Sequence, residues 1–394
     1  MRIPRSSVRG RAGHFAVHAV LAAATVAALL PAGTGLAQYV TLPPSGGNQK
    51  ASVSQWIGPV ELNLTYNSPK VIAPDGTDRR GKIWGELVPW GMGKEIYGTC
   101  GDQCPWRAGA NENTVFRASH AVKVEGKPLP AGSYGVHLLP GKEEWTVIFS
   151  KEYQSWGSFF YDARNDALRV TVKPRKAPYT HWLTYEFVER TPEKATFVLR
   201  WDELEVPVSV AVDDVTSLWV ARIRDELHGS RGGSADAWEQ GASFCLRNKV
   251  NLPEALVWAQ YAVSATYVGR KDFGTLSILA DAQEANGLAA EATKSRQAAL
   301  ELPSAGPVEV HMYGRSLLEK GKKQEALAVF EMNAKRHPNV WPVNVGLARG
   351  YAAVGRNADA LKAAKAAVGQ APDEGNRKNL ERMVQALEAG KPLE

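Results

Sequence analysis

Residues 307–338 read PVEVHMYGRSLLEKGKKQEALAVFEMNAKRHP and show the apolar spacing of two consecutive helices. Small Gly314 stands where the first helix would approach the second, and Phe330 would fill the space between them. Pro338 cannot continue a helix, so it marks the end of the second one. The stretch therefore predicts a pair of packed helices.

This helix pair recurs at a fixed interval. Ala292, Ala326 and Ala360 lie 34 residues apart, each just inside an expected second helix. Pro338 and Pro372 repeat the interval at helix ends. This is the spacing of tetratricopeptide repeats, and the C-terminal third of the chain resembles such an array.

The repeats differ in regularity. The last one keeps the expected small and apolar side chains at Leu347, Ala348, Tyr351, Ala360, Ala367 and Pro372. The first places Arg296 where a large apolar residue is expected. An irregular pair over 238–265 is expected before them, and a capping helix over 374–389 after them. We interpret residues 236–390 as an α-helical solenoid similar to tetratricopeptide arrays.

The hydrophobic rhythm is different before Asp214. Residues 51–214 show short runs of alternating apolar and polar residues separated by turn residues, which favours an antiparallel β-sandwich or a barrel-like domain. The expected strands are 60–66, 114–118, 134–139, 145–149, 168–172, 183–188, 196–201 and 206–212. Residues 215–235 would form a connecting helix, Val215 to Leu227, and a Gly- and Ser-containing linker. Trp219 and Ile223 are suited to packing that helix onto the sheet domain.

The first 37 residues look like a secretory signal. Arg2, Arg5, Arg9 and Arg11 precede an apolar run over 16–30, and Gly35-Leu36-Ala37 is typical of a cleavage site. The mature chain would begin at Gln38 with a linker over 38–50, and the protein would be exported to the periplasm or the exterior of a bacterial cell. Retention of the segment as an uncleaved anchor is the alternative.

The net charge excludes few classes of function. The formal charge of +6 includes the four signal arginines, whose removal leaves +2 on the mature protein. Nucleic-acid binding would need Lys and Arg clustered on one face, so we infer no nucleic-acid partner from the charge.

Cysteine spacing predicts a local disulfide. Cys100 and Cys104 lie in a Gly-containing loop of an exported protein, where oxidation is the natural interpretation. Zinc would need further thiolate or imidazole ligands, and none lies nearby in sequence. Cys245 is expected to be a buried helix residue.

Five motifs in order carry a second resemblance. They are KIWGELVPWG at 82–91, WRAGANE at 106–112, KPLPAGSY at 127–134, EWTVIF at 144–149 and WGSFFYD at 156–162. Residues 52–214 resemble the secreted bacterial family called domain of unknown function 2911, whose members often carry helical repeats after that domain. The family name assigns no activity. This chain departs from the family in a longer segment over 92–105, which contains both loop cysteines.

Three motif residues are candidates for a ligand site. Arg107 could bind a carboxylate or sugar hydroxyls, Asn111 could orient the ligand, and Glu112 could take a proton. The alternative is structural: Arg107 would pair with Glu112 or another acid, and Asn111 would cap a turn.

Tryptophans are the second set of candidates. Trp90, Trp106 and Trp156 lie beside Gly and Pro and could face a groove, where they would stack on sugar rings or peptide. Trp145 and Trp201 lie inside strand patterns and are expected in the core.

No catalytic template fits the chain. It lacks a dinucleotide fingerprint, a nucleophile elbow and a His-Glu-x-x-His motif. His120, His137 and His181 are isolated on different expected strands. We therefore assign no catalytic residue, no metal site and no cofactor.

The sequence favours an exported, non-enzymatic scaffold whose helical repeats bind a protein partner. The alternative is a carbohydrate- or ligand-binding protein or a hydrolase, with its site on the sheet domain around Arg107, Asn111 and Glu112. In a third interpretation the repeats only stabilise the sheet domain.

Overall fold

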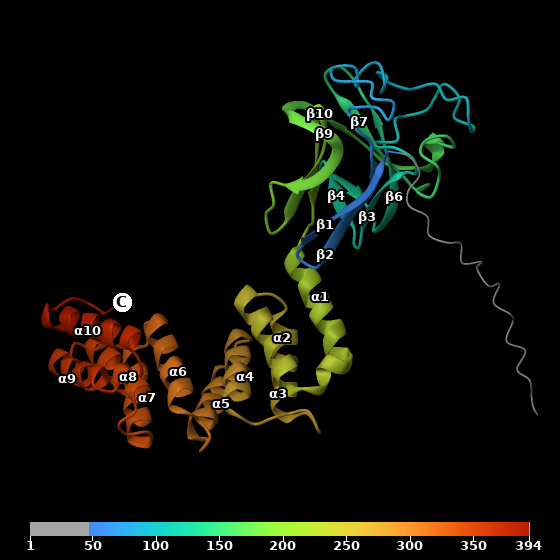
Figure 1. The fold of residues 1–394 in the computed structure, drawn as a ribbon. Coiled ribbons are helices and arrows are strands. Elements are labelled where there is room, and N and C mark those ends of the chain that lie inside the picture. The colour runs from blue at the N-terminus through green and yellow to red at the C-terminus, as the bar shows by residue number, and fades with distance from the viewer. Residues whose placement is uncertain (1–46, 394) are drawn as a thin grey trace, which may run out of the picture. The chain divides into compact units, whose positions relative to one another are not determined.

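The computed structural model describes residues 47–393 (Figure 1), which form two antiparallel β-sheets followed by a series of helices. The expected signal segment, 1–37, and most of the expected linker, 38–50, lie outside the described residues. Within 47–393, every helix is too short or too polar to cross a membrane.

The larger sheet is antiparallel and has the strand order β1-β2-β3-β6-β7-β8. Its strands are β1 (Gln49–Ile57), β2 (Val60–Ser68), β3 (Thr114–Ala118), β6 (Gly132–Leu139), β7 (Trp145–Ser150) and β8 (Asp166–Val172). In β2, Val60, Leu62 and Leu64 are fully buried, whereas the residues between them are only partly buried. The alternation expected from the sequence therefore directs one face of the sheet into the core.

The smaller sheet has the order β5-β4-β10-β9, so the expected β-domain is a two-sheet structure. Its strands are β4 (Val122–Val124), β5 (Lys127–Leu129), β9 (Arg175–Val188) and β10 (Lys194–Ala211). The strands expected at 196–201 and 206–212 are one element, β10, which doubles back on itself. Asp202 has a positive φ of 55° with register shifts on both sides, and Val212 N–H donates to Glu193 O at 2.9 Å. A bulge of this kind bends a strand without ending it.

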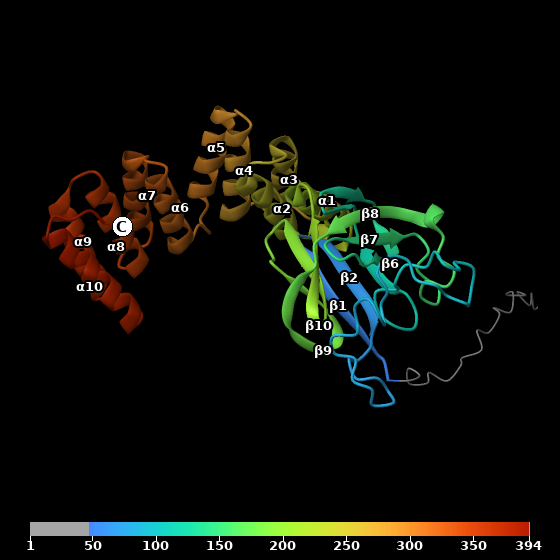
Figure 2. The same cartoon turned by 90° about the horizontal axis from the view of Figure 1, so that it is seen from above.

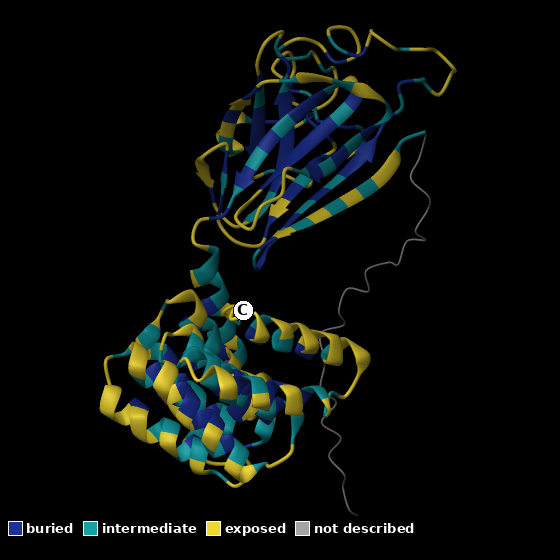
Figure 3. Ribbon diagram, turned by 90° about the vertical axis from the view of Figure 1, so that its left-hand side faces the viewer, coloured by how far each residue is buried: buried dark blue, intermediate teal, exposed yellow. Residues whose placement is uncertain are grey.

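Aromatic side chains fill the core between the sheets. Trp145 and Trp201 are 0% and 2% exposed, which confirms the prediction that both are core residues. Trp84 packs edge-on against both of them, at ring-centroid distances of 5.0 and 5.9 Å. Figure 3 shows the buried stripes of the strands alternating with exposed ones.

Helix α1 (Val215–His228) follows the last strand. Asp214 caps it, because its carboxylate accepts a hydrogen bond from Ser217 N–H at 3.0 Å. Val215 and Leu218 pack against the sheet core. Ile223, which we expected to do the same, packs against α2 instead, because it lies two turns further along the helix.

The remaining helices form consecutive pairs that stack in a TPR-like solenoid (Figures 1 and 2). They are α2 (Ala235–Asn248), α3 (Leu252–Ser264), α4 (Phe273–Ala285), α5 (Ala289–Glu301), α6 (Pro307–Glu319), α7 (Lys323–Arg336), α8 (Trp341–Ala353) and α9 (Asn357–Val368), with α10 (Glu374–Glu388) at the end. The periodic residues Ala292, Ala326 and Ala360 are fully buried in the second helix of their pairs. Their small size lets the helices of each pair approach closely.

Phe330 is the central side chain of two neighbouring pairs. It is fully buried in α7, and a Cβ atom added at Gly314 of α6 would lie 2.3 Å from its ring. Cβ atoms added at Gly346 and Gly350 of α8 would lie 2.5 and 2.8 Å from the same ring. The spacing role predicted for Gly314 is therefore confirmed, and α8 contributes two more glycines to it.

Ion pairs hold the side chain of Arg296 in α5 at the position where an apolar residue was expected. Its side chain is only 16% exposed, and Nη2 lies 3.1 Å from Asp281 Oδ1 and also contacts Glu284. Both acids belong to α4. The cation thus replaces the expected apolar contact between the two helices with charge-assisted hydrogen bonds.

Candidate functional site

Arg107 is held in place from several sides. The preceding residue, Trp106, exchanges two backbone hydrogen bonds with Leu138 of β6, at 2.9 and 2.8 Å, which anchors this part of the loop on the sheet. The Arg107 guanidinium lies 4.5 Å from the centroid of the Phe159 ring, and Nη2 lies 3.6 Å from Glu95 Oε1. Burial lowers the pKa of Arg107, and Glu95 opposes that shift. The side chain is therefore packed and paired rather than presented to solvent.

Asn111 and Glu112 serve the same loop. Asn111 adopts a left-handed conformation with φ of 56°, its carbonyl accepts from Arg107 Nη1 at 3.1 Å, and its side chain accepts from Asn48 Nδ2 at 3.1 Å. Exposed Glu112 accepts from Asn67 Nδ2 at 2.8 Å. Among the described residues, the acid paired with Arg107 is Glu95, not Glu112. Arg107 and Glu112 thus do not act on one bound group in this arrangement.

The three candidate tryptophans have different environments. Trp106 is half-buried and stacks on Trp201, with centroids 6.2 Å apart and ring planes 12° apart. Trp90 and Trp156 are 40% and 48% exposed. The groove role predicted for Trp106 is not supported, because strand pairing directs its ring into the core, whereas Trp90 and Trp156 remain accessible to a ligand.

The loop cysteines form the predicted disulfide, Cys100–Cys104. The backbone N–H groups of Thr99 and Cys100 both donate to Phe159 O, at 2.8 and 3.1 Å. Segment 92–105 is therefore tied to the 156–162 motif, and it supplies Glu95, the partner of Arg107. Cys245 is fully buried in α2, as predicted, and burial raises the pKa of its thiol to about 11.

A buried His–Ser pair was not anticipated from the sequence. His137 Nδ1 lies 2.8 Å from Ser158 Oγ, and both residues are 2% exposed. Burial, with a smaller contribution from Arg107, lowers the pKa of His137 to about 4. A nucleophile would need access to substrate, so the pair joins the 156–162 segment to β6 rather than forming an open catalytic site. Only the spatial neighbourhood, not spacing along the chain, could have revealed it.

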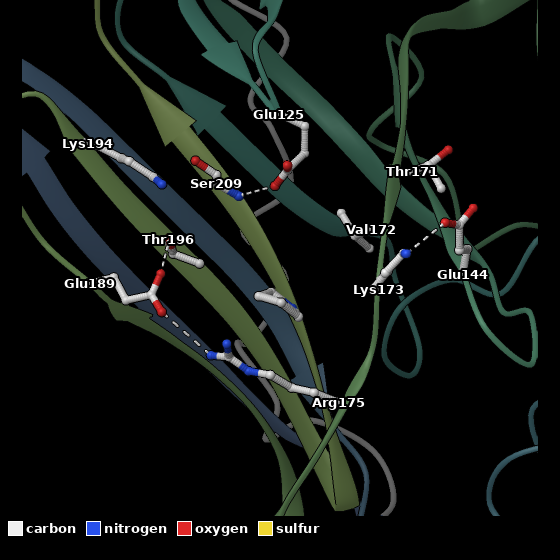
Figure 4. A pocket seen from close by; sticks show the side chains of 11 residues that line it. Glu125, Glu144, Thr171, Val172, Lys173, Arg175, Glu189, Lys194, Thr196 and Ser209 are labelled. Carbon is white, nitrogen blue, oxygen red and sulfur yellow. Dashed lines mark hydrogen bonds and ion pairs between the residues drawn. The ribbon is translucent and has the colours of Figure 1, made fainter.

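A hollow of the sheet domain lies elsewhere (Figure 4). It has a volume of about 570 Å³ and mixes acidic with basic side chains at its wall. Its carboxylates are engaged: Glu189 accepts from Thr196 Oγ1 at 3.1 Å, Glu144 lies 3.6 Å from Lys173 Nζ, and Glu125 accepts from Ser209 N–H at 2.5 Å. Five separate chain segments supply the lining, so no local motif marks the hollow in the sequence.

The histidines singled out from the sequence do not converge. His120 is exposed and bonds Ser119, His181 bonds Tyr179 Oη at 3.0 Å, and His137 is buried beside Ser158. Within residues 47–393, no group of three or more His, Cys, Asp or Glu side chains is arranged to hold a metal ion.

The helical array presents exposed apolar side chains. Val308 and Met312 are 57% and 53% exposed and lie four residues apart on α6, hence on one face of that helix. On α3, Val257 is also 57% exposed. Helix α3 is the second helix of its pair, whereas α6 is the first of its own, and exposed apolar side chains such as those of α6 are candidates for partner contacts.

Residues 48–210 match the model of the family described as "Protein of unknown function (DUF2911)", which confirms the resemblance of the sheet domain. No curated protein matches the chain at a significant level.

Three solved structures match the helical region. "MamA AMB-1" has 16% identity, covers 40% of this chain and 81% of its own, and gives a TM-score of 0.27. "YrrB: a TPR protein with an unusual peptide-binding site" has 14% identity, 43% and 82% coverage, and a TM-score of 0.28. The "Podosopora anserina putative kinesin light chain nearly identical TPR-like repeats" structure has 19% identity, 39% and 95% coverage, and a TM-score of 0.27.

Proposed function

We propose that this is an exported protein that binds another protein through its helical array and does not itself catalyse a reaction. The observation that carries the proposal is the exposed pair Val308 and Met312 on α6, in an array of stacked helix pairs. Arrays of this kind offer a continuous surface to a partner because each helix pair contacts only its neighbours.

The sequence supports export. Arg2, Arg5, Arg9 and Arg11, the apolar run over 16–30 and the small residues at 35–37 are typical of a secretory signal. The Cys100–Cys104 disulfide is also expected in an oxidising compartment.

The test is affinity capture from a bacterial envelope extract with the mature chain and two variants. Val308→Lys with Met312→Lys places charges on the proposed surface, and Val257→Lys does so at an equally exposed valine on α3. We expect a partner that is retained by the Val257→Lys protein and lost from the α6 double variant. Equal capture by all three proteins would show that this face of α6 is not the binding surface.

A second candidate function is favoured by Trp90 and Trp156, whose exposed rings could stack on a sugar. A glycan array probed with the mature chain and with a Trp90→Ala, Trp156→Ala variant tests it. Binding that is lost in the variant supports a glycan-binding sheet domain. A hydrolase would also need Glu112 and a second group to face one substrate, and the contacts of Glu112 and Arg107 in the described chain do not provide this.

A further inference from the structure

Segment 92–105 forms a loop that is closed at its base. Gly93 and Cys104 exchange two backbone hydrogen bonds, at 2.7 and 3.3 Å, and Glu95 N–H donates to Gly101 O at 2.7 Å. The disulfide lies within the same loop. Figure 1 shows the chain before β3, in light blue, as loops at one end of the sheets. The residues between Glu95 and Gly101 therefore form the tip of this loop.

The loop tip exposes apolar side chains. Ile96 and Tyr97 are 80% and 65% exposed, and Gly98 and Thr99 after them are exposed as well. A single apolar side chain in solvent is ordinary, whereas a group of them marks an interaction site. The neighbours of the tip therefore decide how its exposure is interpreted.

A second turn adds to the exposed apolar surface. The Tyr97 and Phe159 rings lie 6.0 Å apart between centroids, and Thr99 N–H donates to Phe159 O at 2.8 Å. Phe160, the next residue, is 53% exposed, and Trp156 of the same turn is 48% exposed. The two adjoining turns thus carry one group of exposed apolar residues. We call this group the apolar rim, and its members are Ile96, Tyr97, Trp156 and Phe160.

The apolar rim has a closely packed base. A Cβ atom added at Gly98 would lie 2.1 Å from Phe159 O, so the backbones of the two turns are in direct contact. On its other side the Phe159 ring is covered by the Arg107 guanidinium, 4.5 Å from the ring centroid. The base therefore holds the rim side chains in solvent rather than letting them fold into the core.

The charges of the loop give no net attraction for a charged partner. Glu95 pairs with Arg107. Lys94 and Asp102, both exposed, are the remaining charged residues of 92–105, and they are opposite in sign. A partner at the rim would therefore be held by apolar contact.

The N-terminal part of the chain enters the sheet domain at this same end. Asn48 Nδ2 donates to Asn111 Oδ1 at 3.1 Å, and Asn111 O accepts from Arg107 Nη1 at 3.1 Å. Arg107 in turn contacts Phe159, which joins the two turns of the rim. The sequence before this entry point contains the apolar run over 16–30. On the export route proposed above, that run lies in the membrane while the protein is translocated.

This position favours a lipid bilayer as the partner of the rim. Residues 31–47 can span at most about 60 Å, so the apolar run holds the rim within reach of the membrane surface. Tyr and Trp are enriched at the boundary between headgroups and acyl chains, where peripheral proteins bury apolar side chains about 5–10 Å deep. A sugar would stack on the flat rings and leave Ile96, the most exposed member, without a contact.

We propose that the apolar rim inserts into the surface of a lipid bilayer and docks the sheet domain on the membrane. Apolar insertion needs no anionic headgroup and is not screened by salt. The inference shares with the proposed function only the export of the chain, because partner binding belongs to the helical array.

Co-sedimentation with extruded vesicles tests the inference. The protein is the chain from Gln38 onward, which lacks the apolar run and so cannot insert through it. One set of vesicles contains phosphatidylethanolamine and phosphatidylglycerol, and the other contains only zwitterionic phosphatidylcholine.

Two double variants are compared with the wild type. Ile96→Ser with Phe160→Ser removes two apolar side chains of the rim and leaves the Tyr97 contact in place. The control, Trp56→Ser with Val257→Ser, removes an aromatic and an aliphatic side chain of 56% and 57% exposure outside the rim. Neither variant changes the tryptophans of the glycan-binding candidate. All four substituted residues are exposed, so both variants should fold, and circular dichroism checks this.

We expect the rim variant to lose about tenfold or more in affinity for both vesicle sets, and the control to stay near wild type. Raising the salt from about 0.1 M to about 0.5 M should leave binding nearly unchanged. Absence of wild-type binding, or equal losses in both variants, overturns the inference. Binding only to the anionic vesicles, or binding that salt abolishes, also overturns it, because a charged surface would then hold the lipid. Each of these results leaves the array capture experiment, and with it the proposed function, to be decided separately.

Discussion

The sheet domain and the helical array differ in what their charged side chains contact. In the sheet domain the motif residues are engaged with the protein itself: Arg107 with Glu95, Glu112 with Asn67, and His137 with Ser158. In the array, Lys323 and Lys391, which lie outside any motif, line a hollow with no acid among its described lining residues. A distinctive motif can therefore record what a loop needs to fold, while binding chemistry gathers on a surface without one.

The largest effect tests the glycine-enclosed core of the array. Phe330→Ala removes a fully buried ring from between α6 and α8, and we expect a loss of about 3–5 kcal/mol in the free energy of unfolding. Thermal unfolding followed by far-ultraviolet circular dichroism measures it. Phe160→Ala is the control, because Phe160 is 53% exposed. A Phe330→Ala loss below about 1 kcal/mol would contradict the packing described.

The second effect concerns acid and the sheet domain. The folded-state pKa of His137, about 4, lies below its ordinary 6.5, so the unfolded state takes up a proton first as the pH falls. Stability is thus complete above pH 6.5 and declines toward pH 4, by about 3 kcal/mol at most.

The matching variant is His137→Gln, which can keep a hydrogen bond to Ser158 but does not titrate. Urea unfolding across this pH range, followed by tryptophan fluorescence, should give a flatter profile for the variant. An unchanged slope would mean that another group carries the acid sensitivity. Burial also lowers the pKa of His311 in the array to about 4, so His311 is the next residue to substitute.

A smaller effect separates the two regions directly. Removing the disulfide by Cys100→Ser with Cys104→Ser should cost about 2 kcal/mol, the loop-closure value for so small a ring. The loss should appear in the fluorescence transition of the sheet domain and not in the helical signal of the array. Equal shifts in both signals would show that the two regions unfold together.

The smallest effect is expected at Arg296. Arg296→Met restores the apolar residue typical of the repeat and removes contacts to Asp281 and Glu284, so stability should stay within about 1 kcal/mol of wild type or rise. Guanidinium unfolding measures it. A loss above about 3 kcal/mol would mean that the ion pairs, not the helix contacts, hold α4 to α5.

The sequence predicted what depends on short-range periodicity. The 34-residue recurrence of alanines located the helix pairs, and alternation in 60–66 located a strand of the sheet domain. The doubling back of β10 was missed, because one aspartate in a left-handed conformation, Asp202, joins two runs that read as separate strands.

The sites were harder to predict, because their contacts join residues that are far apart in the sequence. Glu95 comes from segment 92–105, where we expected the chain to depart from the family, so the resemblance offered no guide to the partner of Arg107. The two hollows at the C-terminal end of the array bring together Lys323, Arg349, Arg382 and Lys391, which are far apart in sequence and carry no common spacing. Charge along a chain does not show which cations gather in space.

The contrast between Phe330 and Arg296 bears on how such an array can change in length. Arg296 makes its contacts within one helix pair, with acids of α4, whereas the Phe330 ring is enclosed by glycines of α6 and α8, which belong to successive pairs. A duplicated or deleted pair beyond α5 would leave the Arg296 contacts whole. A break between α7 and α8 would take the two glycines of α8 away from the Phe330 ring, so the pairs α6–α7 and α8–α9 depend on each other for this contact.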